Sequence, residues 1–218
     1  QDTPVRIFVM GDNQWRDEQA WPLKRARSKT LFLGGNGNAN TPAGDGTLVA
    51  RPPATGATDS YTFDPHDPVP TLFGPGNFTC ATDQRPLAGR KDVLVFQTEP
   101  LTNRVEVTGL PEVELYAASS APDTDWVARL IDVAPDGLAR DVCAGLVRAR
   151  FRKGLDQLGG EGVVQVLRDP AGGDASPVLA AVGQLQFDVF ANRLDIEFNA
   201  PSELSPALYQ AIRLTDAE

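Results

Sequence analysis

Short apolar runs alternate with polar turn segments along the first two thirds of the chain. Runs of this kind, bounded by residues such as Gly, Asn and Pro, are typical of β-strands. The runs are Val5–Met10, Leu31–Leu33, Tyr61–Phe63 and Val93–Phe96. We therefore predict a strand at each of them, the first one closed by a turn at Gly11, Asp12 and Asn13.

Two further segments, Arg104–Thr108 and Glu112–Leu115, alternate between polar and apolar residues. Successive side chains of a strand point to opposite faces, so this pattern predicts half-buried strands. Val127–Val133 and Ala144–Val147 flank the turn residues Pro135, Asp136 and Gly137, and this arrangement predicts an antiparallel hairpin.

These segments predict at least eight strands before residue 153, and the 20 glycines and 18 prolines favour a turn-rich chain. Only Gln14–Arg27 is able to hold one or two helical turns. A parallel sheet would need helical crossovers of adequate length, which the pattern lacks. The predicted fold class is therefore mainly β, most simply a jelly-roll β-sandwich of two packed antiparallel sheets.

After residue 150 the apolar spacing changes to that of helices. Phe151, Leu155 and Leu158 share one helical face, and Gly159-Gly160 is a suitable helix end. Strands are predicted at Val163–Leu167 and Val178–Val182. A second helix is predicted from the apolar stripe formed by Phe187, Phe190, Ala191, Leu194 and Phe198. A last strand is predicted at Tyr209–Leu214. This order predicts a partial ferredoxin-like α/β segment, with domains at 1–152 and 153–218.

Charge is distributed unevenly over the two predicted domains. The net charge is −9, and the segment after residue 153 holds three arginines, no lysine and ten acidic residues. Such a segment is a poor candidate for binding nucleic acid, whose phosphates attract clustered Lys and Arg. Lys24, Arg25, Arg27 and Lys29 form a basic cluster, which we interpret as a solvated approach to a strand, with a nucleic-acid patch as the alternative.

The sequence predicts neither a membrane partner nor a targeting signal, because it lacks a long apolar stretch and a basic segment followed by an apolar one. A cytoplasmic location is expected. The chain starts at Gln1 and its single methionine is Met10. We therefore expect further sequence upstream.

The two cysteines and two pairs of aspartates are candidate metal ligands. Cys80 and Cys143 have no zinc-like spacing to a second Cys or His, so they are read as buried free thiols, with a disulfide as the alternative. Two pairs of aspartates could offer oxygen ligands to calcium, but the calcium-loop motif is absent, which favours solvated carboxylates. The pairs are Asp123 with Asp125 and Asp132 with Asp136.

The sequence offers few candidates for catalysis or ligand binding. The sequence has no G-x-S-x-G pentapeptide, and its single histidine, His66, lies in a proline-flanked turn that favours a surface role over that of a general base. The Gly34–Asn38 loop resembles a phosphate cradle but lacks its lysine, so a simple turn is favoured. Trp15, Trp21 and Trp126 are expected in the core, with a carbohydrate-binding face as the alternative. No catalytic, cofactor-binding or metal-binding residue is predicted.

Several segments keep the order and approximate spacing of one known family. They are Val5–Gly11, Trp15–Glu18, Trp21–Leu23, Phe32–Gly35, Tyr61–Pro70, Asp83–Pro86, Asp92–Leu94, Leu130–Val133 and Pro135–Gly137. Residues 4–152 thereby resemble the C-terminal domain of the cocaine esterase and X-Pro dipeptidyl-peptidase group of α/β-hydrolases. The resemblance implies a jelly roll that packs against a serine-hydrolase core and its helical cap. It also implies that the catalytic Ser, Asp and His lie upstream, so that none maps onto this chain.

The C-terminal part resembles a different family. Phe151–Leu158, Glu161–Val166, Ala181–Val189 and Arg193–Leu194 are similar to the third domain of peptide chain release factor three, a translational GTPase. The similarity covers about residues 150–218 and implies that the nucleotide-binding domain lies upstream. Two partial domains joined at Arg150–Gly154 predict a chimera made by recombination, design or sequence assembly, with a natural two-domain protein as the alternative.

From these resemblances we expect a non-catalytic accessory domain of a serine hydrolase, joined to a translation-factor fragment. The expected partner is the missing hydrolase core domain. Two alternatives stay open, a translation termination fragment that acts through ribosome contacts and a carbohydrate-binding sandwich.

Overall fold

The structure is a computed structural model, and it describes residues 3–40, 44–72, 83–167 and 177–207. The chain divides into two compact units. The first comprises Gln1–Gly109 and Arg129–Ala144, and the second Leu110–Ala128 and Gly145–Glu218. The predicted domain boundary after residue 152 lies inside a helix and stays a prediction.

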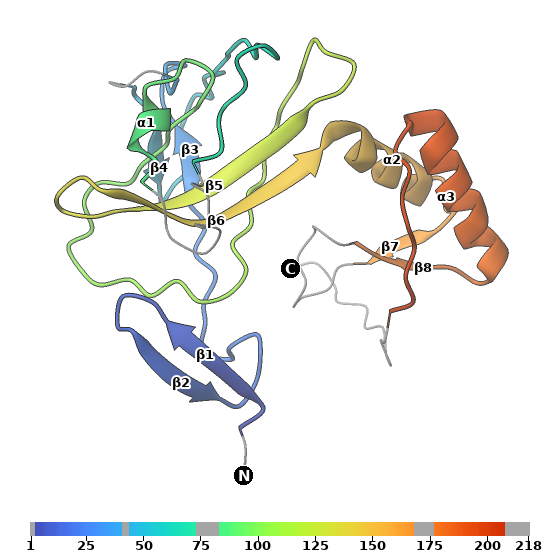
Figure 1. Ribbon diagram of the computed structural model, residues 1–218, viewed down its shortest axis with the longest axis horizontal. Coiled ribbons are helices and arrows are strands. Elements are labelled where there is room, and N and C mark those ends of the chain that lie inside the picture. The colour runs from blue at the N-terminus through green and yellow to red at the C-terminus, as the bar shows by residue number, and fades with distance from the viewer. Residues whose placement is uncertain (1–2, 41–43, 73–82, 168–176, 208–218) are drawn as a thin grey trace. The chain divides into compact units, whose positions relative to one another are not determined.

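The first unit begins with two short antiparallel pairs of strands (Figure 1). β1 (Val5–Val9) pairs with β2 (Gln14–Glu18), and β3 (Phe32–Gly34) pairs with β4 (Thr47–Val49). A tight turn joins β1 to β2, in which Gly11 and Asn13 adopt positive φ angles of 88° and 54°. The predicted strands at the start of the chain and at Leu31–Leu33 are therefore confirmed.

The one or two helical turns that Gln14–Arg27 was able to hold do not form, because the first five of these residues form β2. In β2 the side chains of Arg16 and Glu18 point to one face and those of Trp15 and Asp17 to the other, as the pairing register requires. Cross-strand pairing therefore outweighs the local helical tendency of this polar segment.

The remaining regular elements of the first unit are few. The short helix α1 (Arg85–Ala88) follows the isolated bridge between Asp83 and Arg140. A second bridge joins Thr47 of β4 to Gln97, and the Val95 amide donates to the Ala39 carbonyl at 2.9 Å. The predicted strand at Val93–Phe96 is thus reduced to isolated bonds.

β5 (Asp125–Val133) and β6 (Ala139–Arg148) form the predicted hairpin. The turn between them is closed by the Ala134 amide, which donates to the Leu138 carbonyl at 2.9 Å, and by Gly137 at φ 83°. A side chain at this positive φ would be strained, which explains the glycine. Arg129 binds Asp141 across the two strands at 2.6 Å.

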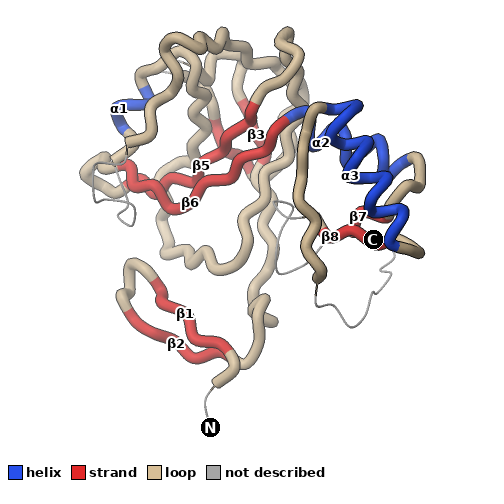
Figure 2. Tube along the Cα trace, turned by 45° about the vertical axis from the view of Figure 1, so that its right-hand side comes forward, coloured by secondary structure: helices blue, strands red, loops and turns tan. Residues whose placement is uncertain are grey.

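The second unit contains two helices and a short hairpin, in the predicted order helix, strand, strand, helix. These elements are α2 (Ala149–Gly160), β7 (Gln165–Leu167), β8 (Val178–Ala180) and α3 (Gln184–Phe198). α2 and α3 lie side by side (Figures 1 and 2) and bury Leu155, Leu158, Phe190 and Leu194 between them and the hairpin. The predicted last strand at Tyr209–Leu214 lies outside the described residues.

Gly154 allows the two helices of this unit to approach closely. A Cβ atom placed at Gly154 would lie 2.3 Å from Leu194 Cδ1 and 3.1 Å from Phe198 Cγ. α3 ends at Asn199, which takes the left-handed conformation with φ 48°, and the Ala200 amide returns to the Leu194 carbonyl at 3.1 Å.

The fold is mainly β, with few helices. Within the described part of the chain, six strands precede residue 153 instead of the predicted eight or more, and all sheets are two-stranded. Three of the predicted strands do not form, those at Tyr61–Phe63, Arg104–Thr108 and Glu112–Leu115. A segment with a strand pattern becomes a strand only when another segment pairs with it. No helix among the described residues combines the length and apolar character needed to cross a membrane.

Candidate functional site: a charged network and an aromatic face on the first hairpin

The β1–β2 hairpin has two chemically different faces. Its register places Val5 opposite Glu18 and Ile7 opposite Arg16, which gives an inner face that is partly buried. Phe8 lies opposite Trp15 on the other face, where both are exposed. The alternation of a short hairpin thus separates a charged network from an aromatic surface.

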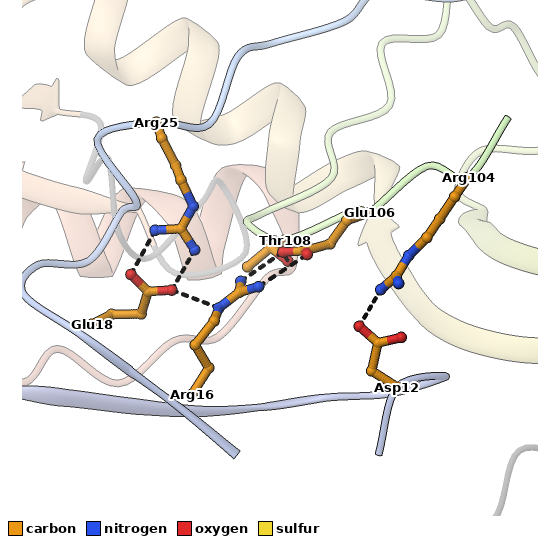
Figure 3. Close-up of polar contacts among 7 residues, drawn as sticks. All are labelled: Asp12, Arg16, Glu18, Arg25, Arg104, Glu106 and Thr108. Carbon is orange, nitrogen blue, oxygen red and sulfur yellow. Dashed lines mark hydrogen bonds and ion pairs between the residues drawn. The ribbon is translucent and has the colours of Figure 1, made fainter. Parts of the chain in front are cut away.

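Glu18 is the centre of the charged network (Figure 3). The residue is only 7% exposed. Its carboxylate accepts hydrogen bonds from Arg16 Nε at 2.7 Å and from two guanidinium nitrogens of Arg25, one of them at 2.6 Å. A buried carboxylate requires such charge-assisted partners to offset the loss of water.

The network extends from Glu18 to a segment that is distant in sequence. Arg16 donates two hydrogen bonds to Glu106, at 3.0 and 2.6 Å, and the Thr108 hydroxyl donates to Glu106 at 2.8 Å. Arg104 binds Asp12 of the hairpin turn. These contacts fix the segment that contains Arg104 to Thr108 against the first hairpin (Figure 3).

The network keeps both glutamates ionised. Hydrogen bonds from Arg25 and then Arg16 lower the pKa of Glu18 to about 2, against the opposing effect of burial. Those from Arg16 and Thr108 lower the pKa of Glu106 to about 2. Carboxylates with such low pKa values are poor proton acceptors at neutral pH, so this network is suited to holding segments together rather than to acid–base chemistry.

The outer face of the hairpin is aromatic and exposed. The Phe8 and Trp15 rings meet edge to face, with centroids 5.3 Å apart, and the Arg6 guanidinium lies 5.5 Å from the Trp15 centroid. Trp15 is 62% exposed and Met10 70% exposed. The prediction that Trp15 lies in the core is therefore wrong, because its register position faces away from the network.

The other two predicted tryptophans differ from Trp15 and from each other. Trp21 is 37% exposed, so it too is not part of a closed core. Trp126 is half-buried in β5. The ring contact of Trp15 is with Phe8.

His66 lies in a structured turn. Its backbone amide donates to Asp64 Oδ1 at 2.8 Å, and the Asp67 amide donates to the Asp64 carbonyl at 3.1 Å. Arg90 binds the Asp67 carbonyl at 2.6 Å and its carboxylate at 3.2 Å. The two aspartates beside His66 thus stabilise the turn, and the histidine is exposed.

The Gly34–Asn38 loop is already occupied by a carboxylate of the chain. Asp45 accepts the Asn36 amide at 2.8 Å and the Asn38 amide at 3.2 Å, and these bonds lower the pKa of Asp45. A phosphate would need the same amide donors. This geometry agrees with the predicted turn.

Three of the four aspartates that could serve as calcium ligands, Asp123, Asp125 and Asp136, bind arginines or the backbone. Arg148 binds Asp125 at 2.8 and 3.0 Å, and Arg150 lies 3.1 Å from Asp123. Asp136 accepts the Leu138 amide at 3.0 Å and caps the hairpin turn. Among residues 3–40, 44–72, 83–167 and 177–207, no group of three metal-ligating side chains is brought together.

The basic cluster lies exposed ahead of β3, as expected of a solvated approach to a strand. Arg25 also belongs to the Glu18 network, and Arg27 donates to the Lys24 and Ala26 carbonyls. The prediction for the cysteines needs a correction. Cys143 is an exposed free thiol, contrary to the prediction of burial, because its strand lies in a two-stranded sheet. Cys80 lies outside the described residues.

The sequence signals missed the role of Arg16, Glu18 and Glu106. Arg16 and Glu106 are 90 positions apart, so no local pattern joins them. The one local signal is the polar run of β2, which is also compatible with one or two helical turns.

Comparison of the sequence with known proteins shows the family of this chain. Residues 1–199 match the model of the X-Pro dipeptidyl-peptidase C-terminal non-catalytic domain. The cocaine esterase of Rhodococcus sp. is 48% identical over 155 residues, which is 69% of this chain and 27% of the relative. A Mycobacterium bovis protein whose name assigns it to the serine esterases is 26% identical over 195 residues, 86% of this chain and 29% of the relative.

A shorter match involves a different protein. Peptide chain release factor 3 of Bordetella pertussis is 47% identical over 64 residues, 29% of this chain and 12% of the relative. The match supports the predicted similarity of one segment to that factor. This chain spans less than a third of each of these relatives. Because the family model matches most of its length, the chain belongs to the family of X-Pro dipeptidyl-peptidase C-terminal non-catalytic domains.

Proposed function

We propose that the chain is an accessory module of a serine esterase, which packs against the hydrolase core and has no hydrolytic activity of its own. The family match over residues 1–199 carries this proposal, since the matched domain is described as non-catalytic. The similarity to a cocaine esterase supports an ester-hydrolysing parent. The expected partner is the hydrolase core domain, and the finer fold proposed is a jelly-roll sandwich.

The chemistry of the described residues supports a scaffolding role. The glutamates of the network have pKa values far below neutrality, and the aspartates beside His66 bind backbone amides and Arg90. Acyl transfer needs an activated nucleophile, a general base and oxyanion donors held together. The contacts found here instead connect turns and strands.

Incubation of the chain with an activated ester, such as 4-nitrophenyl acetate, tests the proposal. We expect hydrolysis at the rate of buffer containing an equal amount of an inert protein. His66→Ala serves as the paired variant and should leave that background unchanged. Saturable turnover by the chain that disappears in His66→Ala would contradict a non-catalytic role.

A second candidate function follows from the match to release factor 3 over 64 residues. The segment would act as a translation-factor fragment through ribosome contacts. Its three arginines and ten acidic residues after residue 153 oppose tight binding to ribosomal RNA. Co-sedimentation with ribosomes in moderate salt would favour this function over the first, and recovery of the chain in the supernatant would exclude it.

A further inference from the structure

Three large apolar side chains of the β1–β2 hairpin are exposed, two on its outer face and one directly after β1. Phe8, Met10 and Trp15 are 45%, 70% and 62% exposed, and Phe8 and Trp15 contact each other edge to face. We call these three residues the aromatic face. Contiguous exposed apolar patches, in contrast to scattered residues, mark interaction surfaces.

The opposite face of the hairpin is bound to other segments of the first unit. Arg16 and Glu18, on the opposite face of β2, are bound to Glu106 and Arg25 at 2.6 to 3.0 Å. A two-stranded hairpin alone is marginally stable in water. Because the ion pairs fix its inner face, the outer face is presented to a partner in one orientation, which reduces the entropy lost on binding.

The composition of this face indicates a largely apolar partner. Aromatic residues, Met and Arg are enriched at protein interfaces, and Trp is frequent among the residues that dominate binding. Arg6 is paired with Asp17 at 3.5 Å and lies over Trp15, so the charges at its edge compensate each other. The face therefore has no net charge to attract a strongly acidic or basic partner.

The comparisons indicate which partner fits. This chain spans 27% of the cocaine esterase and 29% of the mycobacterial relative, and its own family is described as non-catalytic. The catalytic machinery of those esterases therefore lies in the remaining part of each relative. A module of this family is therefore expected to contact that remaining part.

We infer that the aromatic face docks onto the catalytic part of an esterase, with Trp15 as its central contact. This inference rests on the proposed function and adds to it the surface used. The partner offers an apolar area, which covers Trp15, Phe8 and Met10 on binding. A second copy of this chain is the competing occupant.

Binding in trans tests the inference. The partner is the catalytic part of the Rhodococcus cocaine esterase, from which the region matched by this chain has been removed. Isothermal titration compares the unchanged chain with Trp15→Ser, Met10→Ser and the control Tyr116→Ser, whose aromatic ring is 98% exposed in the second unit. We expect the Kd to rise about tenfold for Trp15→Ser and to stay within about twofold for Tyr116→Ser. Circular dichroism verifies that each variant is folded. If Trp15→Ser is unfolded, the Kd of Met10→Ser tests the inference in its place.

A second test joins this chain and the catalytic part in one polypeptide, so that the catalytic part does not have to be prepared separately. The full chain replaces the matched region of the cocaine esterase, and the half-life of the esterase activity of the joined protein is measured at a fixed elevated temperature. We expect Trp15→Ser and Met10→Ser to shorten this half-life and Tyr116→Ser to leave it unchanged.

The outcomes separate the inference from the proposed function. Tight binding and a long half-life in all variants would refute docking through the aromatic face but retain the accessory role. Failure of the unchanged chain to bind, together with an inactive joined protein, would refute the accessory role itself. Concentration-dependent dimers that Trp15→Ser abolishes, without binding to the catalytic part, would assign the face to a second copy.

Discussion

Glu18 shows how one buried charge can hold distant segments together. Its carboxylate is bound by Arg16 and Arg25, and Arg16 in turn binds Glu106 (Figure 3). Each arginine uses several N–H donors in a fixed plane, which suits it to bridging carboxylates. The inner face of the hairpin thereby gains a polar core in place of an apolar one.

Replacing the central carboxylate tests the structural role of the network. Glu18→Gln leaves two arginines with a neutral partner in a largely enclosed place, so we expect the melting temperature to fall by about 3 °C or more. Asp17→Asn is the matched control, because Asp17 and Arg6 are 54% and 65% exposed and exposed pairs contribute little. Differential scanning calorimetry measures both. Equal melting temperatures for Glu18→Gln and the unchanged chain would contradict the assigned role.

The pH dependence of stability tests the same residues. Glu18 and Glu106 have pKa values of about 2 in the folded chain against a usual 4.5, so the folded state favours their ionised forms. Their stabilising effect is present above pH 4.5 and is lost as the pH falls towards 2.

Urea denaturation at several pH values across that window measures this loss. The unchanged chain should lose free energy of unfolding more steeply than a double variant with Glu18→Gln and Glu106→Gln. Parallel slopes for the two proteins would show that these glutamates do not sense acid in the folded state.

At the scale of elements, the sequence predicted best where neighbouring residues make the contacts. The β5–β6 hairpin follows from its turn residues, and α2 and α3 follow from apolar residues at helical spacing. Arg104–Thr108 alternates between polar and apolar residues as a strand does, but it does not form a strand in the structure. Alternation reports that a segment has two different faces, whereas pairing depends on another segment, which a local pattern does not contain.

The closeness of α2 and α3 gives a prediction about one glycine. Gly154→Ala places a methyl group against Leu194 and Phe198, and overpacking of this kind costs about 1–3 kcal/mol. Gly160→Ala is the control, because nothing lies within 4 Å of a Cβ atom at that position. Chemical denaturation should show a lower free energy of unfolding for Gly154→Ala and little change for Gly160→Ala. An unchanged or higher stability for Gly154→Ala would show that the helices are not in close contact there.

At the scale of the whole molecule, sequence motifs predicted the family but not the site. Segments that keep the order and spacing of the family's motifs, such as Tyr61–Pro70 and Leu130–Val133, predicted the hydrolase-associated family. The match over residues 1–199 confirms that prediction. The charged network was not predicted, since Arg16 and Glu106 are far apart in sequence. Nor was the aromatic face, because the burial of Trp15 depends on which face of the hairpin other segments cover.

The match to a release factor bears on the origin of the chain. The release factor similarity covers 64 residues, and the helix–strand–strand–helix unit has its own small core around Leu158 and Phe190. A unit with its own core is able to persist when it is joined to unrelated sequence. This agrees with the predicted chimera.

Labelling with a fluorophosphonate tests the central claim, that the chain is non-catalytic, most directly. These reagents form a covalent bond with serines that a catalytic base activates, and they react poorly with ordinary serines. Intact-mass spectrometry of the full chain, beside a serine esterase labelled under the same conditions, reads out the result. We predict an unchanged mass for this chain. A stoichiometric mass increase located on one of its serines would contradict the account.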